Sequence, residues 1–179
     1  MLTGCPARLK SASPRSNFYG SSGFPKIRML NKDFKEFAEL LNSTGVEYLV
    51  VGDYALAAYG HPRYTGDLDI WIRRSPENAA KLIDALTRFG FGGLGLVESD
   101  FLRPDAVVQL GYPPARIDLL TSIDGVEFDT CHGGRVVMQL GDTALPFIGL
   151  EDFRSNKRAS GRSKDLDDLE SLNQASPPD

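Results

Sequence analysis

The sequence predicts an α/β fold in which a mixed central β-sheet is flanked by helices and followed by C-terminal helices. Segments with helical periodicity alternate with short apolar runs typical of buried strands. One such run ends at Gly52 and opens directly into a helical pattern. With 179 residues, 41% of them hydrophobic and 25% charged, the chain is long enough for one domain with a real core.

The predicted folded domain spans residues 29–172. Residues 1–28 have no sustained periodicity and little apolar surface, so we expect a disordered N-terminal tail, and we expect 173–179 to be a frayed C-terminal tail. Met29 stands where the compact domain is expected to begin, which leaves open whether the tail belongs to the native protein.

The first half of the domain alternates helix and strand. Apolar residues at helical spacing predict a helix that ends at 42–45, followed by a buried strand over 46–51. A short helix over 54–59 follows, and Pro62 then keeps the chain out of helical geometry. The next strand is predicted over 68–72.

The second half begins with the Ser75-Pro76 pair, a capping residue and a first-turn proline, which start an amphipathic helix that reaches Phe89. The segment 92–105 is rich in glycine and then polar, and we expect a mobile loop near the functional site. Two antiparallel strands follow, over 106–110 and 116–121.

Shorter elements complete the domain. Strands are predicted over 135–140 and 145–148, and helices over 151–159 and 164–172, with Gly161 between the helices. No internal repeat is visible in the sequence.

The composition excludes several classes of protein. A net charge of -4 and a pI near 5.2 argue against a uniformly basic nucleic-acid binder. Cys5 and Cys131 lie far apart, which indicates neither a disulfide framework nor a cysteine zinc site and favours a reducing, cytoplasmic location. No apolar run approaches the roughly 18 residues that span a bilayer, and the N-terminus lacks the apolar segment of a signal peptide.

Asp67 and Asp69 form an acidic pair at the start of an apolar strand. Residues two apart on a strand point to the same face, so both carboxylates lie together while Leu68 and Ile70 enter the core. Such carboxylates repel one another unless a divalent cation neutralises them. The pair therefore predicts a Mg²⁺ or Mn²⁺ site, although a solvated strand edge that caps Gly66 would give the same pattern.

Asp118 is the candidate for the third metal ligand. It interrupts an apolar strand between Ile117 and Leu119, where an aspartate needs either a partner or a function. The alternative is a buried ion pair with Arg116 or Arg63.

These residues resemble the DNA polymerase β-like nucleotidyltransferase superfamily. Its signature is a hydrophobic residue, glycine and a small residue, then a gap and Asp-hydrophobic-Asp, which here is Val51-Gly52-Asp53 followed by Asp67-Leu68-Asp69. The chain is most similar to small bacterial members, some of whose relatives are abortive-infection or toxin-antitoxin nucleotidyltransferases. The resemblance covers residues 33–172 and implies a minimal nucleotidyltransferase fold, an NTP substrate, and a metal held by Asp67, Asp69 and Asp118.

One position departs from the superfamily's pattern. Asp53 stands where the superfamily usually has Ser or Gly near the triphosphate, so its carboxylate would repel the phosphates, or it would cap the following helix. Gly52 would let the backbone come close to the triphosphate, and its alternative is an ordinary strand-to-helix turn.

Two polar residues and a histidine precede the acidic pair. Arg63, together with Thr65, would bind the triphosphate or hold the loop through the aspartates. His61 stands before a proline on a loop and is better explained as a structural or surface residue.

The C-terminal segment also resembles the superfamily, where a basic helix is followed by Arg-x-Lys-Asp and a helix near the nucleotide. This resemblance would place Lys157, Arg162 and Lys164 at the phosphates, with Lys157 as the preferred contact. The alternative is a solvated charged face in which Asp165 caps the last helix.

The sequence therefore predicts a metal-dependent nucleotidyltransferase that moves an NMP group from an NTP to an unidentified acceptor hydroxyl on a protein, a tRNA or a small molecule. The aspartates would hold the metal that offsets charge at the α-phosphate, and Asp118 would also accept the hydroxyl proton. The alternative is a catalytically silent nucleotide-sensing or protein-binding member of the fold, as in one half of a toxin-antitoxin pair, which Asp53 favours. A metal-dependent phosphohydrolase would need more histidines than His61 and His132.

Overall fold

The computed structural model describes residues 31–174, so the predicted tail 1–28 and residues 175–179 lie outside the described part. Six strands form one sheet in the order β3-β4-β2-β1-β6-β5. The strands are β1 (Tyr48–Val50), β2 (Asp67–Ile72), β3 (Val107–Leu110), β4 (Arg116–Leu120), β5 (Val136–Leu140) and β6 (Thr143–Phe147). The helices are α1 (Lys32–Thr44), α2 (Gly52–Ala58), α3 (Pro76–Leu86), α4 (Phe128–Gly133), α5 (Leu150–Ser160) and α6 (Ser163–Gln174). None of the described helices is long and apolar enough to cross a membrane.

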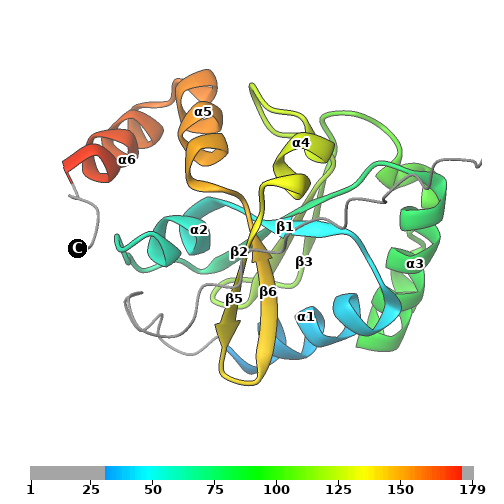
Figure 1. The fold of residues 1–179 in the computed structure, drawn as a ribbon. Coiled ribbons are helices and arrows are strands. Elements are labelled where there is room, and N and C mark those ends of the chain that lie inside the picture. The colour runs from blue at the N-terminus through cyan, green and yellow to red at the C-terminus, as the bar shows by residue number, and fades with distance from the viewer. Residues whose placement is uncertain (1–30, 175–179) are drawn as a thin grey trace, which may run out of the picture.

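The sheet is mixed, as predicted, and its pairing determines which residues share a face. β2 runs antiparallel to β1 and parallel to β4. On one face, Ile72 pairs with Tyr48 and Ile70 pairs with Val50, and the Tyr48 hydroxyl donates to Asn42 of α1. Asp67 and Asp69 therefore project from the opposite face. Figure 1 shows α1 and α3 on one side of the sheet and α4 and α5 on the other.

The helix boundaries confirm the signals at the end of α1 and at the start of α3. α1 buries Phe34, Phe37 and Leu41 and ends at Gly45, whose φ of 70° is left-handed and costs glycine little. Ser75 accepts a hydrogen bond from the Asn78 backbone and so caps α3.

Segment 92–105 is more structured than the loop predicted for it. It contains two short 3₁₀ turns, Gly92–Leu94 and Glu98–Phe101. Phe101 is fully buried, and its turn packs against α3. The single aromatic side chain gives this glycine-rich segment an apolar anchor that composition alone did not indicate.

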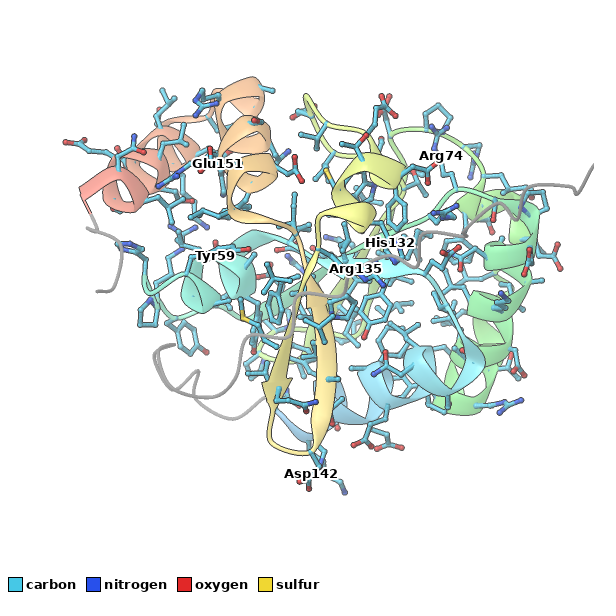
Figure 2. All side chains as sticks on the ribbon, in the orientation of Figure 1. Tyr59, Arg74, His132, Arg135, Asp142 and Glu151 are labelled. Atoms are coloured by element: carbon cyan, nitrogen blue, oxygen red, sulfur yellow. The ribbon has the colours of Figure 1, made fainter. Side chains whose placement is uncertain are left out.

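Helix α4 was not predicted, because it is short and no side chain caps its first turn. Phe128 anchors it edge-on against Trp71 of β2, with ring centroids 5.1 Å apart. At its other end Arg135 donates to the His132 carbonyl, and Figure 2 shows the two residues close together.

Tyr59 ties the end of α2 to the start of α5. Its hydroxyl donates to the Ile148 carbonyl at 2.5 Å, and its ring lies 6.2 Å from that of Phe153 in α5. Figure 2 shows Tyr59 below α5 and α6. This contact keeps the C-terminal helices beside α2, the helix that begins at Gly52.

Candidate functional site

The structure brings the three predicted aspartates together on two adjacent strands. Asp67 and Asp69 lie on β2, and Asp118 lies on β4. In the parallel register Asp69 pairs with Asp118 and Asp67 pairs with Arg116. Paired residues of neighbouring strands are about 5 Å apart and share a face, so the three carboxylates form one cluster.

Gly52 lies directly against the Asp69 carboxylate. A Cβ atom at Gly52 would stand 2.0 Å from Asp69 Oδ2, so the Asp69 carboxylate would have to move. Gly52 also has a φ of 63°, which L-residues adopt only at a cost. The Val51 N–H donates to the Asp69 carbonyl at 3.1 Å. The chain therefore does form a strand-to-helix turn at Gly52, and the lack of a side chain at this glycine makes room for Asp69.

The aspartate cluster carries more negative charge than its surroundings balance. Burial, then the neighbouring carboxylates of Asp67, Asp118 and Asp53, raise the pKa of Asp69 to about 6, and Lys157 offsets this only in part. A carboxyl group whose charge is so disfavoured gains from a nearby cation.

Arg116 is the cation closest to the cluster. It donates through Nη2 to the Asp67 carboxylate and, at 3.1 Å, to Asp118 Oδ2. Its Nε lies 2.9 Å from Asp118 Oδ1, but the two are not aligned for a hydrogen bond. Gln109 of β3 also donates to Asp118 at 3.3 Å. The predicted alternative of an ion pair for Asp118 is thus observed with Arg116 and not with Arg63.

The donor set fits a divalent cation chemically. Asp118 is 6% exposed, and its Oδ1 is buried without a hydrogen-bond partner in the described residues. Carboxylate oxygens are the ligands that Mg²⁺ and Mn²⁺ prefer. Within residues 31–174, however, no three acidic, histidine or cysteine side chains are already gathered around one metal position. Arg116 bridges two of the three carboxylates, so a metal would have to replace it.

A cavity of about 560 Å³ opens beside the cluster. Asp53, Asp67 and Asp69 line it together with Lys157 and Lys164. Further lining residues come from the C-terminal helices and from the connection after β4, namely Asn156, Arg162, Asp165, Ser122, Ile123 and Asp124. The end of segment 92–105 also reaches the cavity, because Asp105 lines it. Acidic and basic walls facing one cavity suit a metal and a phosphate together.

The comparisons with known proteins agree with this architecture. No family model and no curated protein matches the chain. Among solved structures it is similar to a protein from Thermotoga maritima described as a "putative nucleotidyltransferase (TM1012)", with a TM-score of 0.54 and 16% identity over 79% of this chain and 91% of that chain. The fold is nucleotidyltransferase-like. At this identity the likeness concerns the fold alone.

In this nucleotidyltransferase-like fold, Lys157 lies at the cavity but is already paired. It is 5% exposed, and its Nζ lies 2.5 Å from Asp165 Oδ1 and 2.8 Å from Asp168 Oδ2. The alternative of a solvated face is therefore wrong for Lys157. Burial would raise the pKa of Asp165, but hydrogen bonds from Lys157, Ser160 and Arg162 lower it to about 2. Asp165, which accepts these hydrogen bonds, lies in the first turn of α6.

Arg63 and Asp53 belong to the same charged network. Arg63 donates to Asp53 and to Asp168, the latter at 2.5 Å, and Lys164 Nζ lies 3.1 Å from Asp53 Oδ2. Burial would raise the pKa of Asp53, but these cations lower it. Asp53 is not the cap of α2, because Val51 occupies that position. Arg63 holds its loop through Asp53 and Asp168 and not through the acidic pair.

Thr65 orients one member of the acidic pair. Its hydroxyl donates to Asp67 Oδ1 at 2.5 Å. Sequence reasoning did not select Gln109 or Asp168, although both contact candidate residues. Gln109 could have been found by pairing the predicted hairpin, since it stands opposite Asp118. Asp168 had no such signal, because its partner Arg63 is 105 positions away.

Proposed function

We propose that this chain is a divalent-metal-dependent nucleotidyltransferase that transfers an NMP group from an NTP to an acceptor hydroxyl. The acceptor is a protein, a tRNA or a small molecule. The observation that carries the proposal is the pairing of Asp69 with Asp118 across two parallel strands, with Gly52 clearing the space beside Asp69. The nucleotidyltransferase-like fold and the name of its structural neighbour support the same reaction.

The three aspartates share one role in the proposed reaction, and Asp118 has a second. Asp67, Asp69 and Asp118 would hold Mg²⁺ or Mn²⁺, which neutralises charge on the phosphate oxygens and lowers the pKa of an attacking hydroxyl. Thr65 keeps Asp67 in place through its hydrogen bond. Asp118 would accept the proton of the acceptor hydroxyl. The hydroxyl oxygen would bond to the α-phosphorus as pyrophosphate leaves.

The cations on the opposite wall of the cavity are the proposed phosphate contacts. Lys164 is the most available, because its side chain is 63% exposed and its partner Asp53 is its single ion pair in the described residues. Arg63 and Lys157 would contribute positive charge while remaining tied to α6. Gly52 would let the triphosphate approach the backbone.

The first experiment is calorimetric titration of each NTP, with Mn²⁺ or Mg²⁺, into the wild type and an Asp67→Asn/Asp69→Asn variant. Metal-dependent binding that the variant loses supports the proposal. The acceptor is then sought by incubating the protein with α-³²P-labelled NTP and separated cell protein, RNA and metabolite fractions. Label that enters none of these fractions, despite NTP binding, would contradict transferase activity.

One observation favours the catalytically silent alternative. Asp53 stands at the cavity wall, and its carboxylate already binds Arg63 and Lys164, where a triphosphate would otherwise bind. An Asp53→Ser variant separates the two functions. If it binds NTP at least tenfold more tightly than the wild type, Asp53 closes the site, and the native chain is then the silent, protein-binding member of the fold.

A further inference from the structure

We propose that Arg116 neutralises the aspartate cluster when no metal is bound. A metal ion displaces Arg116 from the carboxylates, and the displaced Arg116 then binds the triphosphate. The proposal rests on the proposed function and assigns Arg116 a role that couples the two ligands. One guanidinium contacts the carboxylates of both Asp67 and Asp118. These are two of the three side chains that would hold the metal.

The ion pairs of Arg116 hold the guanidinium at the carboxylates, but they leave one carboxylate oxygen without a hydrogen bond. Asp118 Oδ1 is buried and lacks a hydrogen bond in residues 31–174, although Arg116 Nε lies only 2.9 Å away. The Arg116 side chain is 28% exposed, so the guanidinium has a path to solvent. A metal bound to Asp118 would satisfy the oxygen that Arg116 leaves without a hydrogen bond.

Metal and guanidinium cannot share these carboxylates. Both are cations, and at such short range their repulsion is strong in a partly buried site. Arginine stays protonated, so a displaced Arg116 needs another anion. Its planar fork matches phosphate oxygens, and an NTP supplies them beside the metal. Metal binding thus frees Arg116 for the triphosphate, and triphosphate binding removes the competitor of the metal.

This exchange predicts that the two ligands bind cooperatively, each raising the affinity of the other by the same factor. The probes are Mn²⁺ and inorganic tripolyphosphate, which needs no knowledge of the base. We expect Arg116→Gln to bind Mn²⁺ alone on the order of tenfold more tightly than the wild type, with the coupling to tripolyphosphate lost. Arg116→Lys should keep the charge, so its Mn²⁺ affinity stays near that of the wild type.

Arg73→Gln is a matched control. Arg73 also contacts two carboxylates, those of Glu47 and Asp129, and its side chain is 32% exposed. It should leave Mn²⁺ affinity unchanged. All variants are first checked for native circular dichroism and thermal unfolding, and calorimetry then gives both affinities.

Three results would overturn the proposal: unchanged or weaker Mn²⁺ binding by Arg116→Gln, an equal gain in Arg73→Gln, or coupling to tripolyphosphate that survives in Arg116→Gln. The proposed transferase reaction fails in a different way, through absence of label transfer from NTP while the Mn²⁺ and tripolyphosphate effects persist. The two ideas can therefore be rejected separately.

Discussion

Two groups of three aspartates contribute to the cavity, Asp67 and Asp69 from one group and Asp53 and Asp165 from the other, and the two groups have opposite charge balances. The sheet cluster contains Asp67, Asp69 and Asp118, with Arg116 as the ion-pair partner of two of them. The helix cluster contains Asp53, Asp165 and Asp168, which share the four cations Arg63, Lys157, Arg162 and Lys164. The pKa of Asp69 is raised to about 6, whereas that of Asp165 is lowered to about 2.

The contrast shows that the role of an aspartate depends more on how many cations neutralise it than on its residue type. Carboxylates that are well supplied with cations fasten helices to one another, as Asp168 does between Arg63 and Lys157. Carboxylates that lack such cations repel one another, so binding of a metal cation to them is favourable. The molecule thus has a structural acidic cluster and a candidate metal-binding cluster that both contribute side chains to the same cavity.

The largest expected effect is on stability and comes from Lys157→Met. The variant keeps the side-chain volume but leaves Asp165 and Asp168 buried without their shared cation, so unfolding free energy should fall by about 3–5 kcal/mol. Urea unfolding at pH 7 measures it. Lys81→Met is the control, because Lys81 forms an exposed pair with Glu77 and should cost less than about 0.5 kcal/mol. Equal effects in the two variants would show that the helix cluster is not structural.

Asp69→Asn tests the sheet cluster, where cations do not balance the negative charge, and it should stabilise the metal-free protein. The folded pKa of about 6 exceeds the ordinary 3.8, so native Asp69 holds its proton longer than the unfolded chain does. Wild-type stability therefore falls as pH rises from 4 to 6, and the variant avoids this loss, which is on the order of 3 kcal/mol above pH 6. Thermal unfolding in EDTA at pH 4 and pH 7.5 measures the difference.

Asp165→Asn is the paired control with the reverse sign. The folded pKa of Asp165 lies below its ordinary value, so its contribution is present at neutral pH and is lost as pH falls toward about 2. The variant should be destabilised at pH 7.5 and converge on the wild type in acid. If Asp69→Asn and Asp165→Asn shift stability in the same direction at pH 7.5, the two clusters do not differ as described.

Gly52→Ala should cost about 1–2 kcal/mol more than Gly141→Ala. Both glycines have positive φ, 63° and 65°, so both variants strain the backbone equally. A Cβ at Gly141 meets nothing within 4 Å, whereas at Gly52 it meets the Asp69 carboxylate. The difference in unfolding free energy thus isolates the contact with Asp69. Combining Gly52→Ala with Asp69→Ala should remove the excess, and an excess that persists would contradict that assignment.

Most elements and the sheet cluster were predictable because their signals are local, whereas the short helix α4 and the turns of 92–105 were not. Asp67 and Asp69 alternate with core residues, and Leu68 and Ile70 are indeed 1% and 0% exposed. Asp118 was predictable because a lone carboxylate in an apolar strand needs an explanation. Such patterns require only the period of a strand and the cost of burying charge.

The helix cluster was not predictable, because its partners are distant in sequence. The resemblance placed Lys157 at the phosphates, and the alternative was a solvated charged face with Asp165 as a cap, but α5 packs against α6 and both side chains are buried. Arg63 and Asp168 are 105 positions apart, so no periodicity relates them. The role of Arg116 was open for a similar reason, since the strand pairing that places it beside Asp67 is tertiary.

Among the variants of cavity residues, Lys164→Ala is expected to have the smallest effect on stability, and it distinguishes the two lysines of the cavity. The Lys164 side chain is 63% exposed against 7% for Lys157, so its pair with Asp53 should contribute less than about 1 kcal/mol. The same exposure leaves Lys164 free to move from Asp53 to a phosphate. Calorimetry with Mn²⁺ and tripolyphosphate should then show weaker phosphate binding by about five- to tenfold, since a charged hydrogen bond is lost. Unchanged phosphate affinity would limit Lys164 to fastening α6, and the exposed end of the helix cluster would then be as structural as its buried centre.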